Sequence, residues 1–174
     1  SFLSRGGEIV DKYSVLMSVY IKEKPEYFKA SIDSMLNQTV FPSEFVIVCD
    51  GEITQELYNI IDIYVESYPT LFNIVRLPVN KGLGNALRVG VEACKYEFIV
   101  RMDTDDISLP DRVEKQLAVF DLHPEYSVVG GQISEFVDTP DTIIHYRIVP
   151  TTHEDIYAMA QKRNPMNHVT VCIK

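Results

Sequence analysis

Three carboxylates stand close together at Asp103, Asp105 and Asp106, directly after an apolar run at residues 96–102. On an extended loop alternate residues face the same side, so Asp103 and Asp105 could bind one hard cation. Oxygen ligands favour Mg²⁺ or Mn²⁺. Such a cation would bridge the two phosphates of a sugar nucleotide and offset the negative charge that grows on a leaving diphosphate. In an alternative interpretation, Asp105 and Asp106 precede a helix and stabilise its positive N-terminus.

Three other apolar runs are also followed by polar or glycine-rich segments. Asp50 could accept a hydrogen bond from the N3–H of uracil or contact a ribose, although Asp-Gly is also a common turn pair. Tyr20 could stack on a base, or be an ordinary half-buried tyrosine. Gly82 and Gly84 could let a helix N-terminus approach a ligand, or simply form a tight turn. Together these residues supply the parts needed to hold a base, a ribose and a metal-bound diphosphate.

Alternating strands and helices would bring these segments together. Near-continuous apolar runs predict strands at residues 13–20, 44–49, 72–77 and 96–102. Apolar residues at helical spacing predict helices that begin at Pro25, after the cap residue Thr54, and at Leu83. This order favours a doubly wound α/β fold with a mostly parallel sheet and helices on both faces. Because ligands bind such sheets at the carboxyl ends of the strands, we expect the polar segments to share one edge.

The second half of the sequence predicts shorter elements. The segment from Ser108 to Asp111 matches a capping box, so we expect a helix to open there. We expect short strands at residues 126–131, 133–137, 143–149 and 169–173, and a helix at 154–161.

Composition and charge exclude several classes of protein. The chain has 174 residues and a net charge of −9, with no block of Lys or Arg, so we expect one domain and no nucleic-acid partner. Three widely spaced cysteines in apolar runs favour buried free thiols and a cytoplasmic location. The longest apolar run, residues 13–21, is too short to cross a bilayer, so we expect no membrane span. Peripheral attachment at the inner face of the membrane stays open.

The sequence resembles family 2 glycosyltransferases of bacterial polysaccharide synthesis, which have the GT-A fold. The resemblance runs from about Tyr13 to Lys174, and its motifs are specific only as a set. They lie at residues 14–20, 31–39, 46–51, 80–90, 101–106, 110–112 and 164–168. Cys49 departs from the family pattern, because many members have the first of two aspartates there. The resemblance implies a doubly wound domain at residues 13–174, after an extension or expression residues at 1–12.

The resemblance also implies an activity and a site. The activity is inverting transfer of a sugar from a nucleotide-diphosphate donor, UDP-sugar above others, to a saccharide or lipid-linked acceptor. The metal would be Mg²⁺ or Mn²⁺, bound by Asp105 and Asp103. The nucleotide sugar would contact Ser18, Val19, Tyr20, Asp50, Lys81, Gly82, Asn85, Asp103 and Thr104.

The family's catalytic base usually follows the segment that carries His168. We therefore expect the base beyond Lys174, in a domain cut short at its C-terminus. His168 could line the acceptor side or be structural. A noncatalytic nucleotide-sugar-binding domain or sensor stays open as an alternative function. The sugar, the linkage and the oligomeric state are not indicated by the sequence.

Overall fold

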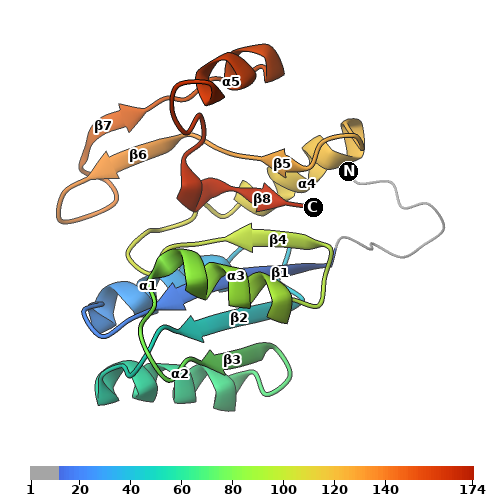
Figure 1. Cartoon of the computed structure of the whole chain (residues 1–174). Coiled ribbons are helices and arrows are strands. Elements are labelled where there is room, and N and C mark those ends of the chain that lie inside the picture. The colour runs from blue at the N-terminus through green and yellow to red at the C-terminus, as the bar shows by residue number, and fades with distance from the viewer. Residues whose placement is uncertain (1–11) are drawn as a thin grey trace.

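The computed structural model describes residues 12–174, so the expected extension at residues 1–12 lies, except for Lys12, outside the described residues. Its first half alternates strands and helices (Figure 1). In chain order these are β1 (Tyr13–Val19), α1 (Pro25–Leu36), β2 (Glu44–Cys49), α2 (Gln55–Ser67), β3 (Phe72–Arg76), α3 (Leu83–Ala93), β4 (Phe98–Arg101) and α4 (Arg112–Leu122). The second half contains β5 (Val128–Val129), β6 (Ile133–Phe136), β7 (Ile143–Arg147), α5 (His153–Ala160), the 3₁₀ helix η1 (His168–Thr170) and β8 (Cys172–Ile173).

The main sheet has six strands in the order β3-β2-β1-β4-β8-β5. β1 pairs in parallel with both β2 and β4, and β2 pairs in parallel with β3. β8 runs antiparallel between β4 and β5. The prediction of a mostly parallel, doubly wound sheet is therefore confirmed, with an antiparallel addition that comes from the end of the chain.

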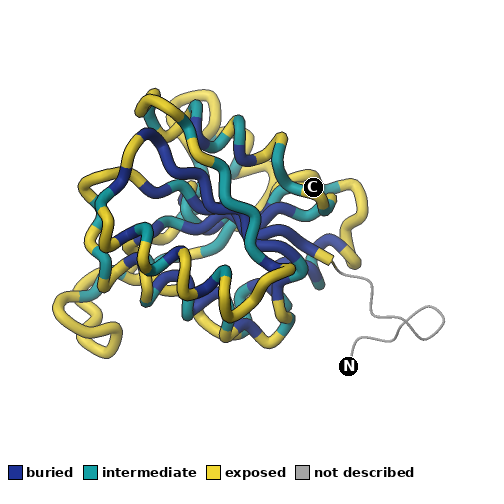
Figure 2. Tube along the Cα trace, turned by 90° about the horizontal axis from the view of Figure 1, so that it is seen from below, coloured by how far each residue is buried: buried dark blue, intermediate teal, exposed yellow. Residues whose placement is uncertain are grey.

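Different helices cover the two faces of this sheet. On one face, α1, α2 and α4 pack against alternate strand residues that include Val15 and Met17. On the other face, Ala86 of α3 packs in a smaller cluster with Leu16. Successive residues of a strand point to opposite faces, which is why β1 serves both clusters. The buried parts of the chain accordingly follow the central strands (Figure 2).

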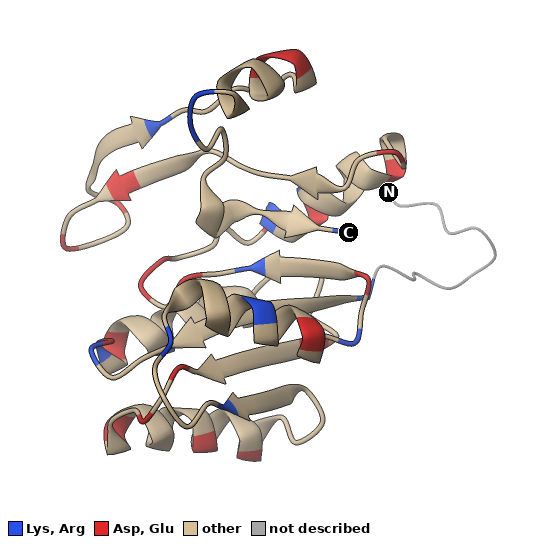
Figure 3. Cartoon of the chain, in the orientation of Figure 1, with Lys and Arg blue, Asp and Glu red and all other residues tan. Residues whose placement is uncertain are grey.

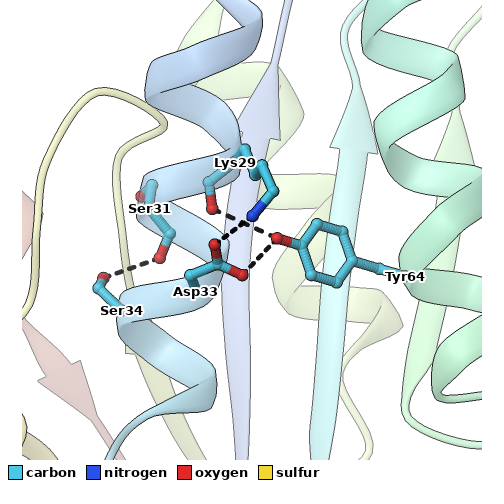
Figure 4. Close-up of polar contacts among 5 residues, drawn as sticks. All are labelled: Lys29, Ser31, Asp33, Ser34 and Tyr64. Carbon is cyan, nitrogen blue, oxygen red and sulfur yellow. Dashed lines mark hydrogen bonds and ion pairs between the residues drawn. The ribbon is translucent and has the colours of Figure 1, made fainter.

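Helix α1 contacts α2 on one flank and the loop after β4 on the other. Its Lys29 and Asp33 face the hydroxyl of Tyr64 in α2, whereas Ser31 and Ser34 lie on the opposite flank (Figure 4). Tyr64 donates a hydrogen bond to Asp33, and Lys29 Nζ lies 2.6 Å from the same carboxylate. On the far side, the Ser31 hydroxyl donates to the backbone carbonyl of Asp103. The helix therefore fixes this loop relative to the core.

The predicted capping box at residues 108–111 is wrong. Helix α4 begins at Arg112, and Asp111 at its N-cap makes no side-chain cap hydrogen bond. The hydroxyl of Ser108 instead accepts a hydrogen bond from Gln38 Nε2. Gln38 Oε1 in turn accepts the backbone N–H of Val113 at 3.1 Å, so a side chain far away in the sequence caps this helix.

The C-terminal elements differ from the sequence prediction mainly in length. The strands expected at residues 126–131 and 169–173 reduce to β5 and β8, and η1 occupies the start of the second. β6 and β7 form a separate hairpin beyond β5. All three cysteines are free, with Cys49 and Cys172 buried and Cys94 partly buried. None of the helices in residues 12–174 combines the length and apolar character that a bilayer crossing requires.

Candidate functional site

The carboxyl ends of β1, β2, β3 and β4 lie at one edge of the sheet, because these strands are parallel neighbours. The segments that follow them are the polar ones expected from the sequence, beginning at Tyr20, Asp50, Leu77 and Met102. Acidic residues are visible on the loops after β2 and β4 at this edge (Figure 3). The structure thus brings the four segments to the same side of the fold.

Asp50 joins the loop after β2 to the loop before α3. Its side chain is only 3% exposed. One carboxylate oxygen accepts the backbone N–H of Lys81 and the other accepts that of Gly82, both at 2.9 Å. Gly82 is the N-cap of α3 and has a φ of 88°, a conformation that glycine adopts at little cost. Asp50 therefore orients the N-terminus of α3, and its contact with a nucleotide stays a prediction.

The three carboxylates after β4 form one cluster. Asp103, Asp105 and Asp106 each offer a carboxylate oxygen, and these atoms lie within 4.8 Å of one another. Asp105 is exposed, while Asp103 and Asp106 are partly buried. Three carboxylate oxygens at this separation suit a hard divalent cation such as Mg²⁺ or Mn²⁺. The sequence interpretation assigned Asp103 and Asp105 to a metal and missed Asp106.

The alternative interpretation of these acids as helix N-terminal residues does not fit the structure. Asp105 and Asp106 lie in the loop between β4 and α4, well before Arg112, and the acid in the first turn of α4 is Glu114. A helix dipole acts mainly within the first turn, so the helix does not account for the position of Asp105 or Asp106.

Hydrogen bonds from α1 and from Gln38, just after it, hold the loop that carries the cluster in place. Besides the Ser31 contact, the Ser34 hydroxyl accepts the backbone N–H of Ser108 at 3.1 Å. Gln38 donates to the carbonyl of Leu109 at 2.8 Å. These contacts explain the polar residues of the 31–39 segment, which the sequence marked as part of a family motif without giving a reason. Their partners lie about 70 residues away, so no local pattern could reveal them.

A buried arginine lies at the base of the cluster. The Arg101 side chain is 5% exposed and forms an ion pair with Asp103. Its backbone carbonyl accepts a hydrogen bond from Arg112 Nη2 at 2.8 Å, and its N–H donates to the carbonyl of Val171. Burial lowers the pKa of Arg112 to about 10. The sequence did not indicate a role for Arg101, because an apolar strand pattern does not show towards which neighbours a single charged side chain points.

The cluster shifts the ionisation of nearby groups. Burial, together with the charges of Asp105 and Asp103, raises the pKa of Asp106 to about 6. Burial also raises the pKa of Glu23, although a hydrogen bond from Thr104 opposes this shift. Burial and the charge of Arg101 lower the pKa of His168, against the opposite influence of Asp103. Glu23 and His168 therefore belong to the electrostatic surroundings of the cluster.

We expect Asp106→Asn to stabilise the metal-free protein by roughly 1 kcal/mol at pH 8, after allowance for solvent screening. Because the pKa of Asp106 rises from 3.8 to about 6 on folding, the folded state favours the protonated carboxyl. Above pH 6 the ionised carboxyl therefore lowers the free energy of unfolding, and this penalty decreases as the pH falls from 6 towards 4. Urea denaturation in EDTA at pH 8 and pH 5 measures the difference, which should shrink at pH 5. Asp121→Asn, at the exposed end of α4, is the control, and equal behaviour of the two variants would contradict the assignment.

The other expected contact residues divide by exposure. Tyr20 is 39% exposed, and Lys81 is also exposed. Ser18 is partly buried, as is Asn85, whose side-chain oxygen accepts a hydrogen bond from Arg88. The side chains of Val19 and Thr104 are buried. The predicted ligand contacts of Val19 and Thr104 are therefore not supported by exposure, whereas Tyr20 and Lys81 are open to a ligand at this edge.

Comparison with known proteins places this geometry in a family. The family described as Glycosyl transferase family 2 matches residues 14–174. The chain is 45% identical over 160 residues to an uncharacterized glycosyltransferase of Haemophilus influenzae, which covers 92% of this chain and 59% of the relative. It is 33% identical over 165 residues to the UDP-Gal:alpha-D-GlcNAc-diphosphoundecaprenol beta-1,3-galactosyltransferase of Escherichia coli, covering 94% of this chain and 58% of the relative.

A solved structure agrees with these relatives. The crystal structure of S. aureus TarS 1-349 in complex with UDP has a TM-score of 0.61 and 25% identity, covering 80% of this chain and 38% of that chain. The chain spans less than two thirds of the length of both curated relatives. The family match nevertheless extends over nearly all of its described residues and includes every segment of the site. The chain belongs to glycosyltransferase family 2, and its sheet has the GT-A fold that this family implies.

Proposed function

We propose that this chain binds the donor of an inverting, divalent-cation-dependent glycosyltransferase. The donor is a UDP-sugar, and the acceptor is a saccharide or a lipid-linked saccharide. In the reaction the acceptor hydroxyl attacks the anomeric carbon from the face opposite the diphosphate. The bond between that carbon and the phosphate oxygen breaks, and the nucleoside diphosphate leaves with the bonding electrons. A carboxylate base takes the proton of the acceptor hydroxyl.

The observation that carries this proposal is the carboxylate cluster at the carboxyl edge of the sheet. Asp103, Asp105 and Asp106 supply oxygen ligands within 4.8 Å of one another. A divalent cation held there supplies positive charge that stabilises the leaving diphosphate. Across the edge, Asp50 fixes the loop that leads into α3, so the N-terminus of this helix has a defined orientation. Helix N-termini favour phosphate groups.

The exposed side chains at this edge suit the remainder of a nucleotide. Tyr20 offers an aromatic face on which a base can stack. Lys81 offers a cation for phosphate oxygens. Asp50 is buried, but its carboxylate has acceptor capacity beyond its two backbone hydrogen bonds, because each oxygen has two lone pairs. These residues therefore carry the proposed contacts to base and diphosphate.

Two similar proteins support the choice of donor and acceptor. The name of the Escherichia coli relative gives UDP-Gal as its donor and a diphosphoundecaprenol-linked sugar as its acceptor. The Staphylococcus aureus structure was solved with UDP. We therefore propose a uridine nucleotide for this chain and leave the identity of the sugar open.

Calorimetric titration tests this proposal. UDP, GDP and dTDP are added to the folded protein with Mn²⁺ and, separately, with EDTA. We expect UDP to bind more tightly than the other two, and we expect its binding to disappear in EDTA. Absence of binding by every nucleotide in a folded sample would end the proposal. Binding that is equally tight in EDTA would contradict the role of the cation.

A further inference from the structure

The buried guanidinium of Arg101 makes an unfavourable contribution to the free energy of folding. Its Nε and Nη1 atoms have no hydrogen-bond partner among residues 12–174. Buried donors without partners cost about 1–3 kcal/mol each. Arg112 lies nearby and adds a second positive charge, since the charge of Arg101 contributes to lowering the pKa of Arg112. The burial of this guanidinium is therefore not explained by hydrogen bonds of its Nε and Nη1 atoms within the fold.

The charge of Arg101 has one carboxylate partner among the described residues, Asp103. Asp103 is also a member of the carboxylate cluster. The carboxylate of Asp103 is therefore shared between the guanidinium of Arg101 and any cation that the cluster binds. The 38% exposure of the Asp103 side chain leaves it open on the cluster side.

We propose that Arg101 is a positioning residue and internal counter-ion of the cluster, which weakens cation binding until a nucleotide diphosphate binds with it. This inference rests on the proposed function, because the nucleotide diphosphate is the anion that the positive charge of Arg101 would help to attract. Because its side chain is buried and pairs with Asp103, Arg101 acts through that carboxylate.

The direction of the effect follows from the charges. Three ionised carboxylates and the guanidinium groups of Arg101 and Arg112 carry one net negative charge. Without the Arg101 guanidinium this net charge becomes two, so the cluster attracts a cation more strongly, and the site loaded with a cation attracts the diphosphate less. Loss of Arg101 should therefore change the two affinities in opposite directions. Simple damage to the structure would weaken both.

The experiment measures free Mn²⁺ by electron paramagnetic resonance at pH 8, first without and then with UDP. We expect Arg101→Met to bind Mn²⁺ about tenfold more tightly without UDP. At saturating Mn²⁺ we expect its affinity for UDP to fall about tenfold. Arg101→Lys restores the charge and should lie closer to the wild type in both measurements. Arg147→Met, which removes an exposed arginine paired with Glu135, is the matched control.

The outcomes separate this inference from the proposed function. If the wild type binds no UDP, the proposed function fails, while the Mn²⁺ titration still tests Arg101. If Arg101→Met binds Mn²⁺ as the wild type does, or more weakly, the counter-ion role is overturned. Circular dichroism checks that the variant is folded. If it is not, Arg101→Gln takes its place, because its amide keeps a polar group while removing the charge, and the same signs are expected.

Discussion

Asp105→Ala is expected to lower the affinity for UDP in the presence of Mn²⁺ on the order of 100-fold. Loss of a residue that merely hydrogen-bonds to a metal ligand already has an effect of up to about this size, and loss of a ligand should have at least as large an effect. Asp105 is the exposed member of the cluster, so its carboxylate is free to meet a cation that also contacts phosphate. The melting temperature should change little, because an exposed loop carboxylate contributes little to the core. Removing one of three neighbouring negative charges can even stabilise the metal-free protein.

Asp111→Ala is the matched control for this prediction. Asp111 belongs to the same loop, but its carboxylate pairs with Lys115 of α4 at 2.6 Å and lies outside the cluster. Its replacement should leave UDP binding unchanged. The free energy of unfolding should fall only slightly, because the ion pair that is lost is exposed. Calorimetry of both variants with and without Mn²⁺ makes the comparison. If Asp105→Ala binds UDP with the cation dependence of the wild type, Asp105 is not a cation ligand.

The fold was predictable where burial and local spacing decide structure. The strands β1 to β4 are near-continuous apolar runs because both faces of the central sheet are covered. Thr54 was expected to cap α2, and its side chain does accept the backbone N–H of Leu57. Parallel strand order then sufficed to place Tyr20, Asp50 and Asp105 at one edge. Each of these steps depends on a pattern formed by residues or elements that follow one another in the sequence.

The supports of the site could not be predicted, because they join residues distant in sequence. Gln38 caps α4 from 75 positions away, so the local resemblance of residues 108–111 to a capping box was misleading. Asp50 was predicted to face a ligand, and its two backbone partners lie 31 and 32 residues further on. Arg101 occurs in a strand pattern without any mark that its charge turns towards Asp103. Local motifs therefore predicted which polar segments share one edge of the sheet, and only the structure shows how those segments are held in place.

Gly51→Ala is expected to destabilise the protein by about 2–4 kcal/mol, because two separate costs add at this position. Gly51 has a φ of 82°, a left-handed conformation that is unfavourable for alanine. An added Cβ would also lie 2.6 Å from the backbone nitrogen of Asn80. Backbone cannot rotate away as a side chain can, so the loop before α3 would have to move. The free energy of unfolding from urea denaturation measures the effect.

Gly84→Ala is the contrasting substitution. Gly84 lies inside α3 with an ordinary φ, and apart from its chain neighbours and the nearby backbone of its own helix, no atom lies within 4 Å of an added Cβ. Alanine should therefore be neutral or stabilising there, by up to about 1 kcal/mol. A loss of stability in Gly51→Ala but not in Gly84→Ala would show that close packing of the loops causes the effect, and not a general intolerance of glycine positions to substitution. If Gly51→Ala is as stable as the wild type, the loops after β2 and β3 are not in the close contact described.

The displacement at Gly51 should also affect the ligand. Asn80 immediately precedes the two residues whose N–H groups bind Asp50, so pushing Asn80 away lengthens those hydrogen bonds. The N-terminus of α3 would then lose its fixed orientation relative to the cluster after β4. We therefore expect folded Gly51→Ala to bind UDP more weakly while its affinity for Mn²⁺ alone stays unchanged. That combination would distinguish a loss of phosphate positioning at α3 from damage to the carboxylate cluster, which would lower both affinities together.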